Sequence, residues 1–422
     1  MEAGQVDLNQ HYDIAIIGGG INGAGLARDL ALRAHLKQKP LRILLLEKSF
    51  WSAGTSGKNS HLIHGGLRYL KYMDFALVRE ALRERSLLLK LASHAVRPLR
   101  FDLPLDTWFK RLYYCCGIGL YDLLATGHRI GKSKYFGKTL TYWDAASDSA
   151  ALVIDNVRDA QHLGADCRPR TKVTEVQSNQ LTLEDGTKID ARAIVDARGP
   201  WMPVAGMRLV RGSHIVVPRL YEGSHAIAHF HTDGRIIFFI PWDGLQPLTL
   251  IGTTDVDHDG SPDHVNISDA ERQYLLTIAR NLFPNRTVKE IVGEFSSLRP
   301  LVAAPGKSAS ATSREHRIEF GADGILRIEG GKYTTYRSMA EEAADKLLAR
   351  IEPSLANFHP TRTEPFRVPV NRPQDFKQRL QWAKREEGCR TAQEFLTCST
   401  NWAWQKRWTQ EEIDAIGEEL AR

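Results

Sequence analysis

The stretch Tyr12–Arg33, YDIAIIGGGINGAGLARDLALR, begins with an apolar run, passes through a cluster of glycines and continues into a helical pattern. The run Ile14–Ile17 predicts a buried strand. Gly18 permits a tight turn after that strand, and Gly20 lets backbone amides approach a pyrophosphate at the helix N-terminus. Gly23 lets the helix pack closely on the strand. The stretch therefore predicts a dinucleotide-binding unit, and a glycine-rich turn without a ligand is the weaker alternative.

A second apolar strand, RILLLEK, ends in Glu47, 24 residues after Gly23. An acidic side chain at this place accepts hydrogen bonds from ribose hydroxyls. FAD and NAD both use such a unit, so the pattern alone leaves the cofactor open. The chain contains no second glycine pattern of the same quality, which favours FAD, because a flavin enzyme with a small donor needs only one dinucleotide site.

Residues 171–187, TKVTEVQSNQLTLEDGT, predict a hairpin with Asp185 and Gly186 at its turn. The next run, ARAIVDARGPW, predicts a strand that ends at Gly199. Further strand-like runs within residues 206–294 are separated by Gly, Pro and Asp turns, which indicates an antiparallel sheet. Near the C-terminus, Thr391 with Glu394 and Thr409 with Glu412 fit capping boxes that start helices.

Length and composition limit the class of protein. A chain of 422 residues predicts two or three cooperating domains, and the net charge of +6 suits an anionic partner. The five cysteines have no CxxC spacing, so neither a disulfide framework nor a metal site is favoured, and a reducing cytoplasm is expected. The polar N-terminus and the lack of long apolar runs predict neither a signal peptide nor a spanning helix.

Residues 107–138 combine basic and apolar side chains. This segment has six Lys or Arg residues, with Asp122 as its one acid, among several aromatic residues such as Trp108 and Phe109. Such a mixture suits a surface that dips into anionic lipid headgroups, and a core helix with a basic solvent face is an equal alternative. Nucleic acid is disfavoured, because no recognised RNA or DNA module accompanies the segment.

Several ordered blocks across residues 12–340 resemble the FAD-dependent glycerol-3-phosphate dehydrogenases. The blocks are DIAIIGGGINGAG, TSGKNSHLIHGGLRYL, RGSHIVVPR, IIFFIPW, IGTTDVD, SLRPL and GGKYTTYR. The resemblance implies an α/β fold: a Rossmann-like FAD-binding domain, an antiparallel β-sheet substrate domain and a small C-terminal helical domain. The predicted limits are residues 10–90, 140–205 and 295–350 for the discontinuous FAD-binding domain, 91–139 for a basic amphipathic insertion, 206–294 for the substrate domain and 351–422 for the C-terminal helical cap.

The resemblance also implies a set of site residues. For FAD these are Gly18, Gly20, Gly23, Glu47, Lys48, Thr55, Ser56, Gly65, Gly66, Gly199, Gly331, Lys332, Thr334 and Thr335. The substrate residues are Arg68, Tyr69, Arg299 and Arg314, and the catalytic residues are His214, Arg299, Arg314 and Lys332. Several cationic side chains suit a phosphate dianion. His214 is the first choice of base because imidazole titrates near neutral pH, and a core histidine is the alternative.

The implied reaction is oxidation of sn-glycerol 3-phosphate to dihydroxyacetone phosphate, with electrons passed to membrane quinone. The expected location is the cytoplasm, at the inner face of the cell membrane. An oxidase that uses O₂ and a catalytically impaired flavin-binding protein remain alternatives, and a related amine or 2-hydroxy-acid oxidoreductase is disfavoured. The oligomeric state is open, with a homodimer among the alternatives. Two residues depart from the family's pattern: His61 replaces a usual lysine, and Arg198 precedes Gly199.

Overall fold

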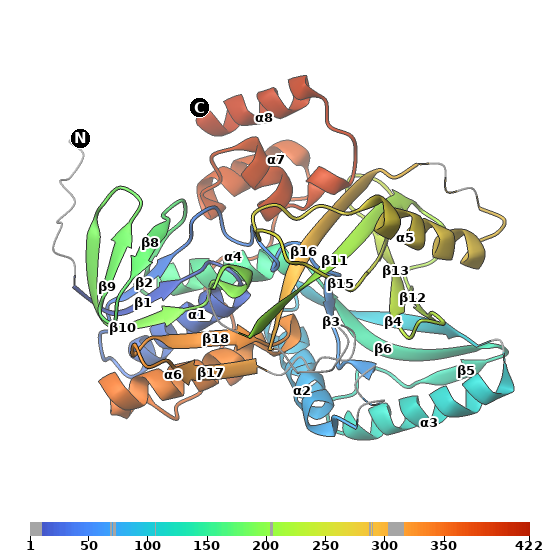
Figure 1. Cartoon of the computed structure of the whole chain (residues 1–422), viewed down its shortest axis with the longest axis horizontal. Coiled ribbons are helices and arrows are strands. Elements are labelled where there is room, and N and C mark those ends of the chain that lie inside the picture. The colour runs from blue at the N-terminus through green and yellow to red at the C-terminus, as the bar shows by residue number, and fades with distance from the viewer. Residues whose placement is uncertain are drawn as a thin grey trace.

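The computed structural model describes residues 11–67, 70, 73–105, 107–202, 206–286, 288, 290–302 and 316–422. Arg68, Tyr69 and Arg314, which the sequence analysis assigns to the substrate, lie outside the described residues. Two sheets lie side by side, and the C-terminal helices cover one end of the molecule (Figure 1). This is the predicted α/β class with two sheets and a helical C-terminal region.

The first sheet has the strand order β17-β18-β10-β1-β2-β7, with the hairpin β8-β9 attached to β10. Its strands are β1 (His11–Ile17), β2 (Ile43–Leu46), β7 (Asp166–Arg168), β8 (Val173–Val176), β9 (Gln180–Leu183), β10 (Lys188–Asp196), β17 (His316–Phe320) and β18 (Leu326–Gly330). β1 pairs in parallel with both β10 and β2, and β10 pairs in parallel with β18. Parallel pairing brings the carboxyl ends of these strands to one edge, where ligands bind in such sheets.

Three helices contribute apolar side chains to one core with this sheet. They are α1 (Ile21–Leu36), α4 (Ser149–His162) and α6 (Tyr336–Ile351). Ile14 of β1 and Leu26 of α1 are fully buried in that core, as are Ile154 of α4 and Leu347 of α6. The strand and helix predicted from the glycine stretch are therefore confirmed.

The hairpin differs in detail from the prediction. β8 and β9 turn between Gln177 and Gln180, where the Gln177 amide donates to the Gln180 carbonyl. The turn at Asp185 and Gly186 connects β9 to β10 instead, and β9 pairs antiparallel with β10. The three strands form a continuous meander because both turns are short.

The second sheet has the order β15-β11-β14-β13-β12-β4-β6-β3, with β16 beside β11 and β5 beside β6. Its strands are β3 (Leu62–Ile63), β4 (Val96–Pro104), β5 (Lys134–Phe136), β6 (Thr139–Ser147), β11 (Met207–Pro218), β12 (Ala226–Phe230), β13 (Ile236–Trp242), β14 (Leu248–Gly252), β15 (Val256–Asp257) and β16 (Gly293–Val302). The strand-like runs of residues 206–294 are thus found as antiparallel strands. The sheet also extends to β4 and β6, which come from earlier in the chain, and β12 pairs with β4 in parallel.

Further helices flank the second sheet. They are α2 (Phe75–Leu91), α3 (Trp108–Leu124) and α5 (Asp269–Leu282). α3 lies along the lower edge of the molecule, below β5 and β6 (Figure 1). No helix in the described part of the chain is both long enough and apolar enough to cross a membrane.

The C-terminal region contains α7 (Phe376–Trp382), α8 (Gln410–Ala421) and two π-helical segments, Ala383–Glu387 and Glu394–Ser399. Thr409 and Glu412 form the predicted capping box at the start of α8. The side chains of Thr391 and Glu394 likewise exchange hydrogen bonds with each other's backbone amides. The helical character of this region is therefore confirmed.

Candidate active site

A cavity of about 1010 Å³ is lined by residues of both sheets. The first sheet contributes the carboxyl ends of β1, β2 and β10 to its wall, and the second sheet contributes parts of β11, β13 and β16. The C-terminal region adds a group of side chains to the same wall: Thr391, Gln393, Glu394, Thr397 and Cys398. The cavity therefore lies at the sheet edge where a dinucleotide is expected.

The glycine turn leaves no room for side chains at two positions. A Cβ atom on Gly18, whose φ is +112°, would lie 2.6 Å from the carbonyl oxygen of Ala197. A Cβ atom on Gly23 would lie 2.0 Å from the carbonyl oxygen of Gly18. Gly20 caps α1 without a side chain, so the positive end of the helix dipole faces the cavity.

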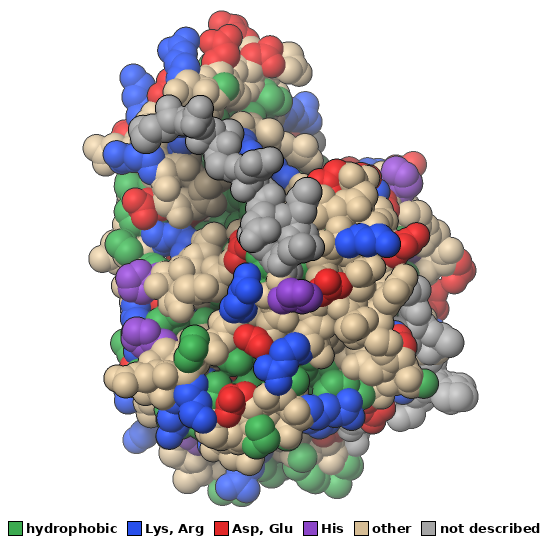
Figure 2. Space-filling model, turned by 90° about the vertical axis from the view of Figure 1, so that its left-hand side faces the viewer, with side chains coloured by type: hydrophobic (Ala, Val, Ile, Leu, Met, Phe, Trp, Pro, Cys, Tyr) green, Lys and Arg blue, Asp and Glu red, His purple; other side chains and the backbone are tan. Residues whose placement is uncertain are grey.

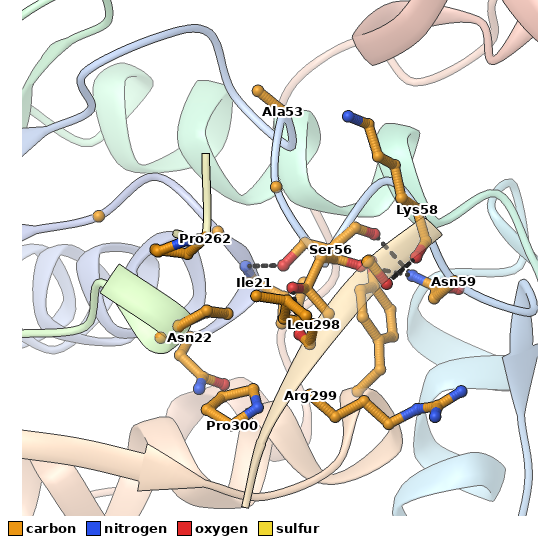
Figure 3. A pocket seen from close by; sticks show the side chains of 18 of the residues that line it. Ile21, Asn22, Ala53, Ser56, Lys58, Asn59, Pro262, Leu298, Arg299 and Pro300 are labelled. Carbon is orange, nitrogen blue, oxygen red and sulfur yellow. Dashed lines mark hydrogen bonds between the residues drawn. The ribbon is translucent and has the colours of Figure 1, made fainter. Parts of the chain in front are cut away.

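Two side chains hold this turn from neighbouring segments. Ser56 Oγ accepts a hydrogen bond of 2.9 Å from the Ile21 amide (Figure 3). The Glu47 carboxylate accepts from the amides of Gly19 at 2.7 Å and Ser49 at 2.8 Å. Burial raises the pKa of Glu47, and these two amide donors oppose that rise. The turn is thus preorganised beside an acidic side chain at the end of β2.

A segment that follows β15 reaches across to the first sheet. Asp263 Oδ1 accepts from Lys48 Nζ at 2.6 Å and from Trp201 Nε1 at 2.7 Å. The Lys48 ammonium also lies 4.4 Å from the centre of the Trp201 ring. Pro262, Asp263 and Val265 line the cavity, so this clasp connects the two sheets at the cavity wall.

A buried histidine faces the other part of the cavity. His214 on β11 is 1% exposed, and its Nε2 atom lies 2.9 Å from Ser60 Oγ. Its ring stacks on Phe295 with centroids 4.9 Å apart. Burial, with further contributions from Arg299 and His61, holds the pKa of His214 well below its ordinary value of 6.5. The imidazole is therefore neutral at pH 7, and burial disfavours its protonated form.

Arg299, Lys332 and Arg198 are among the cationic residues that share the cavity wall with this histidine. Arg299 on β16 donates to Asp255 Oδ1 at 2.6 Å and to Thr253 Oγ1 at 2.7 Å. Lys332, which follows β18, lines the cavity. Arg198, which follows β10, lines it as well. Arg198 also donates to the buried carboxylate of Asp196 at 2.6 Å, so its positive charge is matched by that carboxylate. The cavity wall therefore carries guanidinium groups held in place by carboxylates, together with the neutral imidazole of His214.

Comparison with known proteins assigns the family. The family model described as FAD dependent oxidoreductase (DAO) matches residues 13–337. A glycerol-3-phosphate dehydrogenase of Pseudomonas aeruginosa is 37% identical over 403 residues, which cover 86% of this chain and 76% of that protein. A D-erythritol 1-phosphate dehydrogenase of Brucella abortus is 35% identical over 379 residues, which cover 79% of this chain and 73% of that protein. The chain belongs to the DAO family of FAD-dependent oxidoreductases.

A solved relative supports the same fold. The glycerol-3-phosphate dehydrogenase of Bacillus halodurans, complexed with FAD, superposes with a TM-score of 0.69 at 23% identity. The match covers 97% of this chain and 94% of that structure. The resemblance seen in the sequence and the choice of FAD over NAD are therefore confirmed.

The residues of this oxidoreductase fit FAD. The turn at Gly18–Gly20 and the uncapped start of α1 form a cradle for a pyrophosphate, and any Cβ at Gly18 would obstruct the backbone there. Glu47 lines the cavity, where it can accept hydrogen bonds from ribose hydroxyls. FAD, when bound, supplies the acceptor for a hydride.

The structure places most of the predicted site residues together. Those that line the cavity are Gly18, Gly20, Glu47, Lys48, Thr55, Ser56, Gly66, Gly199, His214, Arg299, Gly331, Lys332 and Thr334. Gly23, Gly65 and Thr335 are not among the lining residues. Gly23 packs behind the turn, and Thr335 is buried against Lys332 and Met339. Gly65 faces Tyr121 and Leu82, which leave no space for a Cβ atom.

Sequence reasoning missed several cavity residues. Ser60 lies inside the quoted family block, and its nearness to a histidine 154 residues away has no local signal. Asp263 lies in a polar loop without a recognisable pattern. The sequence predicts Glu394 only as part of a helix cap. In the structure it also forms a bidentate ion pair with Arg170 beside the cavity. His61, one of the two departures, is buried between Trp242 and Phe295.

Proposed function

We propose that this FAD-dependent oxidoreductase converts sn-glycerol 3-phosphate to dihydroxyacetone phosphate. The observation that carries the proposal is the neutral base His214 beside Arg299 in one cavity. Oxidation of a secondary alcohol removes a hydride from carbon and a proton from oxygen, so the site needs a base next to a hydride acceptor. A phosphate dianion needs fixed cations, and Arg299 is held in place by Asp255.

In this proposal His214 takes the hydroxyl proton at Nε2, directly or through the hydroxyl of Ser60. Arg299 and Lys332 hold the phosphate group and the negative charge that develops on oxygen, and Arg68, Tyr69 and Arg314 join them. Loss of the C2 hydride, which carries two electrons, and of the hydroxyl proton turns the C2–O bond into a carbonyl, and FAD, when bound, would supply the hydride acceptor. Phe101 and Phe238 add apolar surface to the cavity wall.

The choice of phosphorylated polyol is testable, because relatives of similar identity are named for glycerol and erythritol phosphates. Steady-state turnover with a dye acceptor compares sn-glycerol 3-phosphate, D-erythritol 1-phosphate and unphosphorylated glycerol. The proposal expects the highest kcat/KM with sn-glycerol 3-phosphate and almost none with glycerol. Equal turnover of glycerol and its phosphate would contradict the role of the cationic wall.

We further propose that electrons pass to membrane quinone and that the protein binds the membrane peripherally. Support comes from α3, whose exposed side chains include Trp108, Phe109, Leu112 and Tyr113, each more than half exposed. Phe136 on β5 is 62% exposed, and the segment 107–138 that contains both elements has six Lys or Arg residues. Exposed apolar side chains in a segment rich in Lys and Arg fit anionic lipid. By contrast, Figure 2 shows Lys and Arg interspersed with Asp and Glu on another face.

Oxygen is the alternative acceptor, and one assay separates the two. Turnover with a soluble quinone analogue under nitrogen is compared with hydrogen peroxide release in air. The proposal expects rapid quinone reduction and little peroxide. Stoichiometric peroxide with slow quinone reduction would make the protein an oxidase.

A further inference from the structure

The segment His64–Gly66 is held from two sides where it passes the cavity. On one side, Thr334 Oγ1 accepts from the His64 amide at 3.1 Å and donates to the His64 carbonyl at 3.3 Å. On the other side, the Gly65 amide donates to Tyr121 Oη at 2.9 Å and to Asp144 Oδ1 at 3.2 Å. His64 and Gly66 line the cavity. The segment is therefore clamped between the turn after β18 and a buried polar group.

That polar group is an ion pair with a phenol. Arg85 Nη1 donates to Asp144 Oδ1 at 2.6 Å, and the Tyr121 hydroxyl donates to the same oxygen at 2.7 Å. Arg85, Tyr121 and Asp144 are each at most 2% exposed. Burial and the neighbouring Asp144 raise the pKa of Tyr121 well above 10, so its hydroxyl keeps its proton. The Tyr121 hydroxyl and the Asp144 carboxylate are thus held in place where both accept a hydrogen bond from the Gly65 amide.

The packing around Gly65 also depends on close contact with Tyr121. A Cβ atom there would lie 2.4 Å from Tyr121 Oη and 2.6 Å from Leu82 Cδ2. The missing side chain at this position therefore serves the contact with Tyr121. Gly66, whose φ is +77°, then turns the chain so that its backbone lines the cavity.

A purely structural role explains these contacts less well. A buried ion pair adds little net stability compared with apolar packing, so its presence suggests that it holds the neighbouring backbone in a specific position. Asp144 itself lines the cavity, and Arg85 is fixed by carbonyl groups of Trp143 at 2.9 Å and His128 at 3.1 Å. Every member of the group is held by a further contact, which restricts where the Gly65 amide can lie.

We propose that Tyr121, Asp144 and Arg85 are positioning residues for the oxidation, because they fix the Gly65 amide and so place the His64–Gly66 wall of the cavity. The part that concerns substrate rests on the proposed function. Tyr121 belongs to α3, so the helix with the exposed aromatic surface also contacts the cavity wall.

Tyr121→Phe in the FAD-loaded full chain tests this assignment, because it removes one oxygen and keeps the ring. We expect roughly a tenfold lower limiting rate of flavin reduction by sn-glycerol 3-phosphate, with an altered flavin circular dichroism spectrum and faster hydrogen exchange in residues 62–67; one hydrogen bond to a charged group corresponds to a factor of about ten. Tyr114→Phe, on the same helix and packed on Phe230, is the matched control and should leave all three readouts unchanged.

The outcomes separate the two proposals. If wild-type protein is not reduced by this substrate, the proposed function fails, and the flavin spectrum and hydrogen exchange still decide the positioning role. A lower melting temperature of Tyr121→Phe with unchanged flavin spectrum and unchanged exchange in residues 62–67 overturns the assignment. Asp144→Asn should reproduce the Tyr121→Phe changes in exchange; if that variant does not fold, the phenylalanine variant alone decides.

Discussion

Ser60 Oγ and His214 Nε2 lie 2.9 Å apart, although 154 residues separate them in the chain. Ser60 lies just before β3 (Leu62–Ile63) of the second sheet, and His214 is on β11. The His214 Nδ1 atom is buried without a hydrogen-bond partner among the described residues. Among the described residues, Ser60 is therefore the hydrogen-bond partner of the imidazole, whose ring also stacks on Phe295.

Ser60→Ala removes this contact and leaves the fold intact. We expect the limiting rate of anaerobic flavin reduction to fall about tenfold, since one hydrogen bond contributes about 1 kcal/mol and orientation adds to it. The substrate KM should change little, because Ser60 acts on the base. Thr174→Ala, an exposed change on β8, serves as the control. An unchanged reduction rate in Ser60→Ala would show that His214 is oriented by other means.

His61 makes the protein sensitive to acid. Burial lowers its pKa from 6.5 to about 4, so below pH 6.5 the unfolded chain binds a proton that the folded chain does not. Stability therefore falls as the pH drops from 6.5 to about 4, by about 3 kcal/mol from this residue. His61→Asn does not titrate and tolerates the left-handed backbone, whose φ is +52°. The free energy of unfolding, measured with urea at several pH values, should fall less below pH 6.5 in His61→Asn than in the wild-type protein. An equal fall in both proteins would contradict this role of His61.

The clasp at Asp263 should slow loss of the cofactor. Asp263→Ala removes the contacts to Lys48 and Trp201, and we expect FAD to dissociate about two- to fivefold faster, because partly exposed ion pairs contribute up to about 1 kcal/mol. Flavin fluorescence after dilution measures the rate. Asp259→Ala, on the same loop and exposed, is the control. Equal dissociation from both variants would remove Asp263 from the account.

The exposed face of α3 should carry the affinity for lipid. Trp108→Ser combined with Phe109→Ser removes two large apolar side chains, each of which gains about 1.5–3 kcal/mol when fully buried. We expect sedimentation with vesicles containing phosphatidylglycerol to fall at least tenfold, while dye-coupled turnover stays the same. Leu245→Ser changes an exposed apolar residue elsewhere and should keep vesicle binding. Undiminished sedimentation of the double variant would place the lipid contact on another surface.

The sequence predicts the local geometry of the glycine turn more readily than contacts between distant segments. Gly18, Gly20 and Glu47 are close in sequence, and their roles follow from local turn, helix and strand geometry. Gly65 shows the limit: its lack of a side chain serves Tyr121, a partner 56 residues away that only the fold reveals. The contact of Asp263 with Lys48 spans 215 residues, and a polar loop has no periodicity that could predict it.

The sheet boundaries show a similar limit. β4 and β6 pair with each other and extend the sheet of β11, but they flank the basic segment in the sequence. A strand's partner depends on tertiary packing, so strand-like runs predict strands without predicting their sheet. The domain limits therefore remain predictions, while the two-sheet arrangement is established.

The most direct test of the account is anaerobic mixing of FAD-loaded protein with sn-glycerol 3-phosphate while the oxidised-flavin absorbance is recorded. We predict rapid bleaching with this substrate and none with glycerol, and Arg299→Ala should need about ten- to a hundredfold more substrate because a charged contact is lost. Persistent oxidised absorbance, in a protein whose flavin dithionite still reduces, would contradict the assignment of sn-glycerol 3-phosphate as the electron donor.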